Sequence, residues 1–344
     1  MKSLLDPLLS GLSLIFLLAI RIRLYLYQVG LIKSERLPGK TWSIGNISVG
    51  GTGKSPITIS LAQMLVSSGY RPAILTRGYG SPIASRDSMV LLAGKVITAA
   101  ISTSTIPDEA RMQSAKLPTV PVIAGPDRVA AAKNFLQNHP QYQPTHWLLD
   151  DGYQHLKLER DLNLVLLDAR TPFPAIMPLG RAREPARNLD RANLIVFTRS
   201  DEHSPSEEEI HRVSSFTMAG TPVLKTRMRT SPPILSVDGN VNFELSFHSP
   251  TALVSGIADP KQLLEAVKAM QIEIGGHLSL GDHEPIPRDA LHKFLSDKRS
   301  LLTTAKDYWR DPEFFGSLSV PVFILDLEVS WDQINLRETL REYI

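Results

Sequence analysis

Residues 41–55 read TWSIGNISVGGTGKS, an apolar run followed by a glycine-rich loop and a lysine. Thr41 to Asn46 is predicted to form a buried strand, and Pro56 to Ser68 has the apolar spacing of an amphipathic helix. Arg71 to Thr76 is a second short apolar run, which is typical of a strand. This order of strand, loop, helix and strand predicts an α/β fold of the P-loop NTPase type, with a parallel sheet and helices on both of its faces.

The loop itself matches the phosphate-binding pattern G-x-x-x-x-G-K-[ST] at every position but the first, where Ser48 replaces glycine. Glycines let the backbone turn tightly and bring its N–H groups to phosphate oxygens at the start of a helix. Lys54 is expected to neutralise the β- and γ-phosphates during catalysis, and Ser55 to complete a Mg²⁺ shell. The residues predicted to bind ATP are Gly50, Gly51, Thr52, Gly53, Lys54 and Ser55. A glycine-rich turn followed by a surface lysine is the alternative.

Two adjacent carboxylates end another predicted strand, His146 to Leu149, in the run WLLDDG at 147–152. The carboxyl ends of parallel strands lie beside the phosphate loop, so Asp150 and Asp151 are expected to hold Mg²⁺ together with Ser55. Asp-Gly is also a common turn pair, which makes a plain turn the alternative.

Further apolar runs predict strands that are buried on both faces. They are Val120–Ala124, Asn163–Leu167 and Leu194–Thr198. Beyond them, 206–214 is expected to be an acidic surface helix and 221–238 a linker. Strands near 251–256 and 320–327, with a helix over 260–270, predict a smaller second α/β domain. The predicted division is a hydrophobic helix in residues 1–30, a P-loop core in 31–220, and the linker with the smaller domain in 221–344.

The composition is that of a folded globular protein, with 344 residues, 43% of them hydrophobic and 21% charged. The net charge is +2 and no block of like charges occurs, so a nucleic-acid surface is not indicated. The chain has no cysteine, which excludes disulfides, thiolate metal sites and cysteine nucleophiles.

The N-terminal region is almost wholly apolar from Leu8 to Ile20, and Arg21, Arg23, Tyr25 and Tyr27 follow. The run is shorter than the roughly 20 apolar residues that span a bilayer, but its basic and aromatic flank suits the headgroup layer. We expect a membrane anchor that lies in the bilayer or barely spans it. A buried core helix and a cleaved signal peptide are the alternatives, although no small-residue cleavage site follows the apolar run.

Several motifs occur in a fixed order along the chain. They are GNISVGGTGKSP at 45–56, TRGYG at 76–80, LDDGYQH at 149–155, Arg160-Asp161, PLGRAREP at 178–185 and GDH at 281–283. Together with the hydrophobic N-terminus, these motifs resemble the tetraacyldisaccharide 4′-kinase family, the lipid A 4′-kinases of Gram-negative bacteria. The resemblance covers residues 40–310.

This resemblance implies an ATP- and Mg²⁺-dependent enzyme that phosphorylates the 4′-hydroxyl of tetraacyldisaccharide 1-phosphate to give lipid IVA in lipid A synthesis. It implies two α/β/α domains joined by a hairpin linker, behind an N-terminal helix at the cytoplasmic face of the bacterial inner membrane. The expected partners are the lipid A disaccharide 1-phosphate substrate and the bilayer, with no nucleic acid and no obligate protein partner.

The resemblance also assigns roles to single residues. Asp108 becomes the catalytic base with His283 as its partner, because a carboxylate next to a histidine can accept the proton of the attacking hydroxyl. Arg183 becomes a candidate clamp for a phosphate. The residues expected at the substrate are Arg77, Arg128, Arg183 and Glu184. A surface position or a structural ion pair is the alternative for these residues and for His283.

Two positions depart from the family pattern. The family has Gly-Asp-Glu-Pro where this chain has IPDEA at 106–110, so Glu109 competes with Asp108 as the base. The family has Thr-Glu-Lys-Asp where residues 304–307 read TAKD. A membrane-associated P-loop GTPase or ATPase switch is the alternative function, although the sequence has no clear Asn-Lys-x-Asp guanine motif. An intact Gly-Lys-Ser and paired aspartates argue against a non-catalytic nucleotide-binding adaptor.

Overall fold

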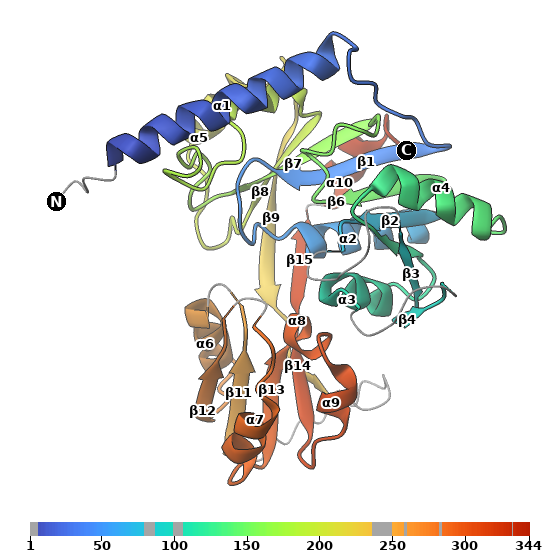
Figure 1. Cartoon of the computed structure of the whole chain (residues 1–344). Coiled ribbons are helices and arrows are strands. Elements are labelled where there is room, and N and C mark those ends of the chain that lie inside the picture. The colour runs from blue at the N-terminus through green and yellow to red at the C-terminus, as the bar shows by residue number, and fades with distance from the viewer. Residues whose placement is uncertain are drawn as a thin grey trace.

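The computed structural model of the chain describes residues 6–78, 87–98, 106–235, 250–257, 260–281, 284–331 and 333–344. These residues form two lobes of unequal size, joined by a pair of antiparallel strands (Figure 1). The first described helix, at residues 6–28, and the C-terminal residue Ile344 both belong to the larger lobe.

The described part of the larger lobe contains a ten-stranded sheet. In spatial order its strands are β15 (Leu327–Trp331), β9 (Val223–Thr230), β8 (Leu194–Thr198), β7 (Leu162–Asp168), β1 (Lys40–Asn46), β6 (His146–Asp150), β2 (Pro72–Thr76), β5 (Val122–Ala124), β3 (Met89–Leu92) and β4 (Lys95–Val96). All neighbours from β9 to β5 run parallel. The P-loop strand β1 therefore lies inside the sheet, with β6 and β7 on either side.

Helices cover both faces of this sheet, as the sequence predicts for strands that are apolar throughout. One face packs against helices whose apolar residues include Ile57, Leu61 and Leu336. The opposite face packs against Phe135 and, further along the sheet, Val213. The helices of this lobe are α2 (Lys54–Ser67), α3 (Asp108–Lys116) and α10 (Gln333–Leu340) on the first face, and α4 (Arg128–Asn138), the 3₁₀ helix η1 (Ala186–Arg191) and α5 (Glu207–Ser214) on the second.

The smaller lobe has a five-stranded sheet of its own within the described residues. Its strands in spatial order are β10 (Ile234–Leu235), β14 (Val322–Leu325), β13 (Ser300–Thr304), β11 (Thr251–Ser255) and β12 (Ile274–Ser279). Its helices are α6 (Pro260–Ala269), α7 (Arg288–Leu295), α8 (Ala305–Tyr308) and α9 (Pro312–Gly316). Leu263 of α6 and Leu291 of α7 belong to separate apolar clusters, so helices cover both faces here as well. The predicted α/β fold with a smaller second α/β unit is thus confirmed.

The path between the lobes differs from the one predicted. Residues 221–238, expected to be a linker, contain β9, which extends the larger sheet. Residues 320–327, expected to be one strand, divide at Asp326 between β14 and β15. The reason is that β15 pairs antiparallel with β9, with Leu327 opposite Thr230. Residues 327–344 consequently return to the larger lobe.

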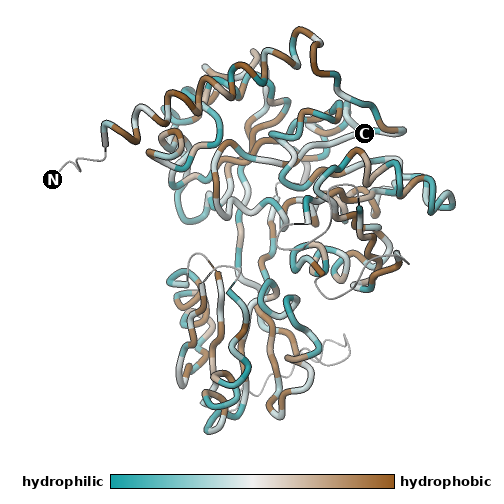
Figure 2. Tube along the Cα trace, in the orientation of Figure 1, coloured by the Kyte–Doolittle hydropathy of each residue, from teal (hydrophilic) through white to brown (hydrophobic). Residues whose placement is uncertain are grey.

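The predicted N-terminal helix is present as α1 (Asp6–Gln28) and lies along the larger lobe (Figure 1). Within Pro7–Gln28, a window of 18 residues has a mean hydropathy of 1.8 and only 6% of that window is buried, so the helix is long and apolar enough to cross a membrane. Figure 2 shows the apolar residues running along the helix. Leu14 and Ile15 are 68% and 66% exposed, which argues against the alternative of a buried core helix.

Candidate functional site

The predicted phosphate loop joins the end of β1 to the start of α2. Gly53 precedes α2 with φ 81°, and Gly50 has φ 108°, both in the region that favours glycine. A Cβ atom on Gly50 would lie 2.2 Å from Nη2 of Arg181, and one on Gly53 would lie 2.1 Å from Cε of Met228. The positive φ angles therefore favour glycine at both positions, and the ends of the Arg181 and Met228 side chains lie close to this backbone.

Two hydrogen bonds hold the phosphate loop in place. Asn46, at the end of β1, donates its side-chain amide to Oγ1 of Thr52 at 2.8 Å. The backbone N–H of Val49 donates to the carbonyl oxygen of Arg181 at 2.8 Å. The GRAREP segment, distant in sequence, therefore lies directly against the phosphate loop.

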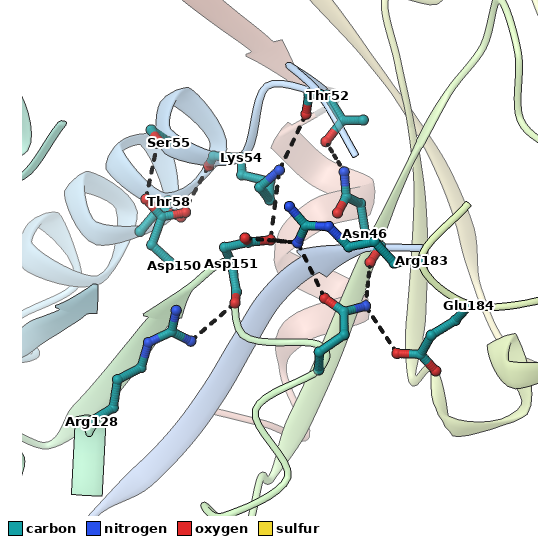
Figure 3. Close-up of polar contacts among 12 residues, drawn as sticks. Asn46, Thr52, Lys54, Ser55, Thr58, Arg128, Asp150, Asp151, Arg183 and Glu184 are labelled. Atoms are coloured by element: carbon teal, nitrogen blue, oxygen red, sulfur yellow. Dashed lines mark hydrogen bonds and ion pairs between the residues drawn. The ribbon is translucent and has the colours of Figure 1, made fainter. Parts of the chain in front are cut away.

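Asp150, at the end of β6, faces the hydroxyl groups of Ser55 and Thr58 (Figure 3). Its carboxylate accepts from Oγ of Ser55 at 3.0 Å, from Oγ1 of Thr58 at 3.3 Å and from Nε2 of Gln113. Burial and the adjacent Asp151 charge raise the pKa of Asp150, against the opposing effect of Lys54.

Asp151 faces cations instead (Figure 3). Nη1 of Arg183 donates to both of its carboxylate oxygens, at 3.0 and 2.8 Å, and Nζ of Lys54 lies 3.6 Å from Oδ1. Burial by itself would raise the pKa of Asp151, but Lys54 and Arg183 outweigh burial, so the pKa lies below its ordinary value. Nη1 of Arg128 donates to the Asp151 carbonyl oxygen at 3.0 Å.

The four residues expected at the substrate differ in exposure. The side chain of Arg183 is 28% exposed, and Arg77, which follows β2, is exposed. Arg128 is 4% exposed, and burial lowers its pKa. Glu184 is 3% exposed, and its oxygens accept from Gln154, Asn188 and Arg191. Glu184 thus supports the loop that carries Arg183.

Asp108 is the first residue of α3 and lies at the junction of the two lobes. Its Oδ1 accepts from the backbone N–H of Glu109 at 2.8 Å, and its Oδ2 accepts from Nε of Arg310 at 3.4 Å. His283 lies outside the described residues, so the pairing of Asp108 with His283 stays a prediction. The competitor Glu109 is buried, and its pKa is raised to about 7, first by burial and then by the charge of Asp150.

The chain matches the sequence model of the family described as LpxK, tetraacyldisaccharide-1-P 4′-kinase, over residues 5–344. The chain belongs to this family. The tetraacyldisaccharide 4′-kinase of Pelobacter propionicus is 36% identical over 275 residues, which are 79% of this chain and 72% of that one. The Chlorobium limicola enzyme is 30% identical over 338 residues, covering 95% and 94% of the two chains.

A solved structure agrees with this assignment. LpxK from Aquifex aeolicus, crystallised in complex with ATP, superposes with a TM-score of 0.77 at 28% identity and covers 99% of both chains. The resemblance read from the motifs of the sequence is therefore confirmed.

Arg199 was not predicted, yet it contacts the phosphate loop of this tetraacyldisaccharide 4′-kinase family member. It follows β8, and its Nη2 donates to the carbonyl oxygen of Gly51 at 2.6 Å. Its Nη1 donates to Oδ2 of Asp168, the last residue of β7, at 2.7 Å. Arg199 could have been found from the sequence, because it directly follows the predicted strand Leu194–Thr198 at the edge where the phosphates bind. Gln113 and Arg310 carried no comparable signal.

An apolar cavity of about 370 Å³ lies between α1 and the loop that carries Arg183. Phe16, Ile20 and Leu24 line its α1 side, and Arg183 and Glu184 line its inner side. The exposed helix therefore adjoins the segment that contacts the phosphate loop. A larger cavity of about 1000 Å³ lies at the amino ends of β1 and β6, the opposite edge of the sheet from the phosphate loop.

Proposed function

We propose that this chain transfers the γ-phosphoryl group of ATP to the 4′-hydroxyl of tetraacyldisaccharide 1-phosphate, giving lipid IVA for lipid A synthesis. The observation that carries the proposal is that Asp151 forms ion pairs with both Lys54 and Arg183. These ion pairs connect the phosphate loop to the GRAREP segment of the family. Phosphoryl transfer depends mainly on positioning and charge neutralisation, which this arrangement supplies.

The nucleotide end of the reaction belongs to the loop between β1 and α2. The backbone N–H groups of the loop and the start of α2 suit phosphate oxygens, and Lys54 adds a positive charge. Asp150 and Ser55 would hold Mg²⁺, since both offer oxygen atoms and lie 3.0 Å apart. Oε1 of the buried Gln113 has no hydrogen-bond partner among the described residues, which suits a metal-bound water. When bound, Mg²⁺ neutralises phosphate charge.

At the lipid substrate, the 4′-hydroxyl must lose a proton during the reaction. The 4′-oxygen attacks the γ-phosphorus, the bond from that phosphorus to the bridging oxygen breaks, and ADP leaves. Asp108 accepts the hydroxyl proton, with His283 as its partner by family resemblance. Arg183, whose charge is partly exposed beside Asp151, binds a phosphate of the substrate or the transferring group, with Arg77 and Arg128 adding positive potential.

The apolar helix α1 holds the enzyme at the bilayer that contains its lipid substrate. Its exposed leucines and isoleucines, and the basic residues Arg21 and Arg23, suit insertion beside the headgroups. The cytoplasmic face of the inner membrane is the proposed location, because ATP is available there.

The test incubates full-length protein with ATP labelled in the γ-phosphate and lipid A disaccharide 1-phosphate in detergent micelles. Label is expected in the lipid, and Lys54→Ala should reduce transfer on the order of 100-fold or more. Lys157→Ala is the matched control, since Lys157 is 56% exposed and pairs with Asp127 rather than with Asp151. Equal release of inorganic phosphate with and without lipid, and no label in the lipid, would favour a nucleotide switch instead.

A further inference from the structure

Arg310, two residues after α8 in the smaller lobe, reaches across to the larger lobe. Its Nη1 lies 3.1 Å from Oδ1 of Asp307 and donates to the Glu284 carbonyl oxygen at 3.2 Å, and its Nη2 donates to the Gly256 carbonyl oxygen at 3.0 Å. Its Nε donates to Oδ2 of Asp108 at 3.4 Å. One ion pair and two backbone carbonyls in the smaller lobe therefore hold a guanidinium whose Nε–H points at Asp108 of the larger lobe.

Asp307, the ion-pair partner of this guanidinium, is itself held by hydrogen bonds. The side chain of Asp307 is fully buried, and its Oδ2 accepts from the Gly256 backbone N–H at 3.0 Å and from Oγ1 of Thr304 at 2.6 Å. A Cβ atom on Gly256 would lie 2.7 Å from Nη1 of Arg310 and 3.0 Å from Oδ1 of Asp307. The guanidinium of Arg310 is thus closely packed against Gly256 and Asp307 of the smaller lobe.

On the other side of the contact, Asp108 is held at one oxygen by its own helix and at the other by Arg310. The side chains of Asp108 and Arg310 are each only 11% exposed. The same helix, α3, carries Gln113, which donates to Asp150 beside Ser55. α3 therefore connects the smaller lobe to the phosphate site, with Asp108 at the point of contact.

We propose that Arg310 is a positioning residue, which orients the Asp108 carboxylate from the smaller lobe and so makes phosphoryl transfer depend on contact between the lobes. This inference rests on the proposed function, in which Asp108 accepts the proton of the 4′-hydroxyl. A base must lie within hydrogen-bond reach of that proton, so losing the Arg310 contact that orients the carboxylate lowers the fraction of productive complexes.

Two further ion pairs join α3 to the smaller lobe and provide an internal comparison. Arg111 pairs with Glu313 of α9, and Lys116 pairs with Asp326. Neither pair includes Asp108. If the ion pairs only hold the lobes together, loss of the Arg111 pair should resemble loss of the Arg310 pair.

The experiment compares Arg310→Gln, Arg310→Lys, Arg111→Gln, Asp108→Asn and the Asp108→Asn/Arg310→Gln double variant in the full-length enzyme. For Arg310→Gln we expect kcat to fall on the order of 10- to 100-fold, with the Kd for ATP and the KM for lipid within about twofold, because only orientation of the base is lost. Arg310→Lys keeps the charge and should recover part of that loss, whereas Arg111→Gln should stay within about threefold of wild type.

The double variant separates positioning from a general effect of lobe contact. If Arg310 acts through Asp108, the double variant should be no slower than Asp108→Asn alone, because residues that act as a unit are not additive. An Arg310→Gln enzyme with wild-type kcat, equal losses for Arg310→Gln and Arg111→Gln, or multiplied losses in the double variant would each overturn the inference.

The same assays separate this inference from the proposed function. If the wild-type enzyme transfers no phosphate to lipid, the proposed function is wrong. If Asp108→Asn is fully active, Asp108 is not the base. Either result also overturns the inference about Arg310. If Arg310→Gln does not fold, Gly256→Ala displaces the guanidinium by its new Cβ and should give the same loss of kcat with unchanged ATP affinity. Wild-type kcat in folded Gly256→Ala would count against Arg310.

Discussion

Nη1 of Arg183 donates to both carboxylate oxygens of Asp151, at 3.0 and 2.8 Å, whereas the neighbouring Asp150 accepts from the hydroxyl of Ser55 at 3.0 Å. The two aspartates are adjacent in sequence, but the backbone of Asp151 has φ 51° and the side chains reach different partners. Asp150 therefore suits a hard cation with oxygen ligands, and Asp151 suits the placement of Lys54 and Arg183.

Substitution of each aspartate should consequently have a different kinetic effect. Asp150→Asn is expected to lower kcat on the order of 100-fold and to raise the Mg²⁺ concentration for half-maximal rate, because the proposed Mg²⁺ ligand loses its charge. Asp151→Asn should mainly raise the KM for lipid by loosening Arg183, with a smaller change in Mg²⁺ dependence. Initial rates over a Mg²⁺ titration measure both effects, and the same Mg²⁺ curve for both variants would contradict the division of roles.

Arg199 provides a second prediction, since it joins the phosphate loop to β7. Arg199→Gln should raise the KM for ATP about tenfold, equivalent to about 1.4 kcal/mol, because the Gly51 carbonyl loses a charged donor. Arg170→Gln is the matched control, because Arg170 also pairs with Asp168, at 2.9 Å, and with Glu202. The KM for ATP of both variants is measured by ATP titration at saturating lipid. Equal KM values would show that the effect comes from the charge around Asp168 and not from the contact with Gly51.

The apolar surface of α1 leads to a third prediction. Replacing Leu14, Ile15 and Leu18 together by serine should move the protein from the membrane to the soluble fraction and reduce turnover of long-chain lipid, because these side chains are 68%, 66% and 56% exposed. Deletion of residues 1–27 should have the same effect. Val66→Ser, an exposed apolar position on α2, serves as the control. Complete membrane retention of the deletion variant would place the anchor elsewhere in the chain.

The sequence predicted the centre of the larger sheet best, because central parallel strands are continuous apolar runs. The predicted strand Leu194–Thr198 coincides with β8, whose residues are all buried. Strand β9 escaped prediction because Lys225, Arg227 and Arg229 give it a polar, half-exposed pattern near the edge of the sheet. The division between β14 and β15 at Asp326 was missed because it depends on the pairing of β15 with β9, which is distant in sequence, and not on the local sequence pattern.

The candidate site was predictable where its residues lie in contiguous motifs. The phosphate loop and the aspartate pair occupy short stretches with recognisable spacing, and the structure brings Ser55 and Asp150 into contact, while their binding of Mg²⁺ stays a prediction. Gln113 and Arg310 reach the site only through the packing of α3 between the lobes. A single glutamine in a helix, or an arginine after one, gives no sign of such a contact in the sequence.

His146 leads to the last prediction, which concerns stability. It begins β6, is 1% exposed, and packs edge-on against Trp42 and Tyr70 at ring distances of 5.2 and 5.0 Å. Nδ1 lies 3.0 Å from Oγ1 of Thr145, and Nε2 has no hydrogen-bond partner among the described residues. Burial, assisted by the charge of Lys40, lowers the pKa of His146 from 6.5 to about 4.

Between these two pH values the unfolded chain binds a proton that the folded protein does not, so the free energy of unfolding should fall as the pH is lowered from 6.5 towards 4. The loss attributable to His146 is roughly 3 kcal/mol at most, from about 1.4 kcal/mol per pKa unit. In urea unfolding of the full-length protein in detergent, His146→Gln should flatten this pH dependence. It should not abolish it, because burial also lowers the pKa of His155, to about 3. The exposed His203 offers the control His203→Gln, which should keep the wild-type slope. An unchanged slope in His146→Gln would mean that this imidazole is solvated and protonated in the folded protein.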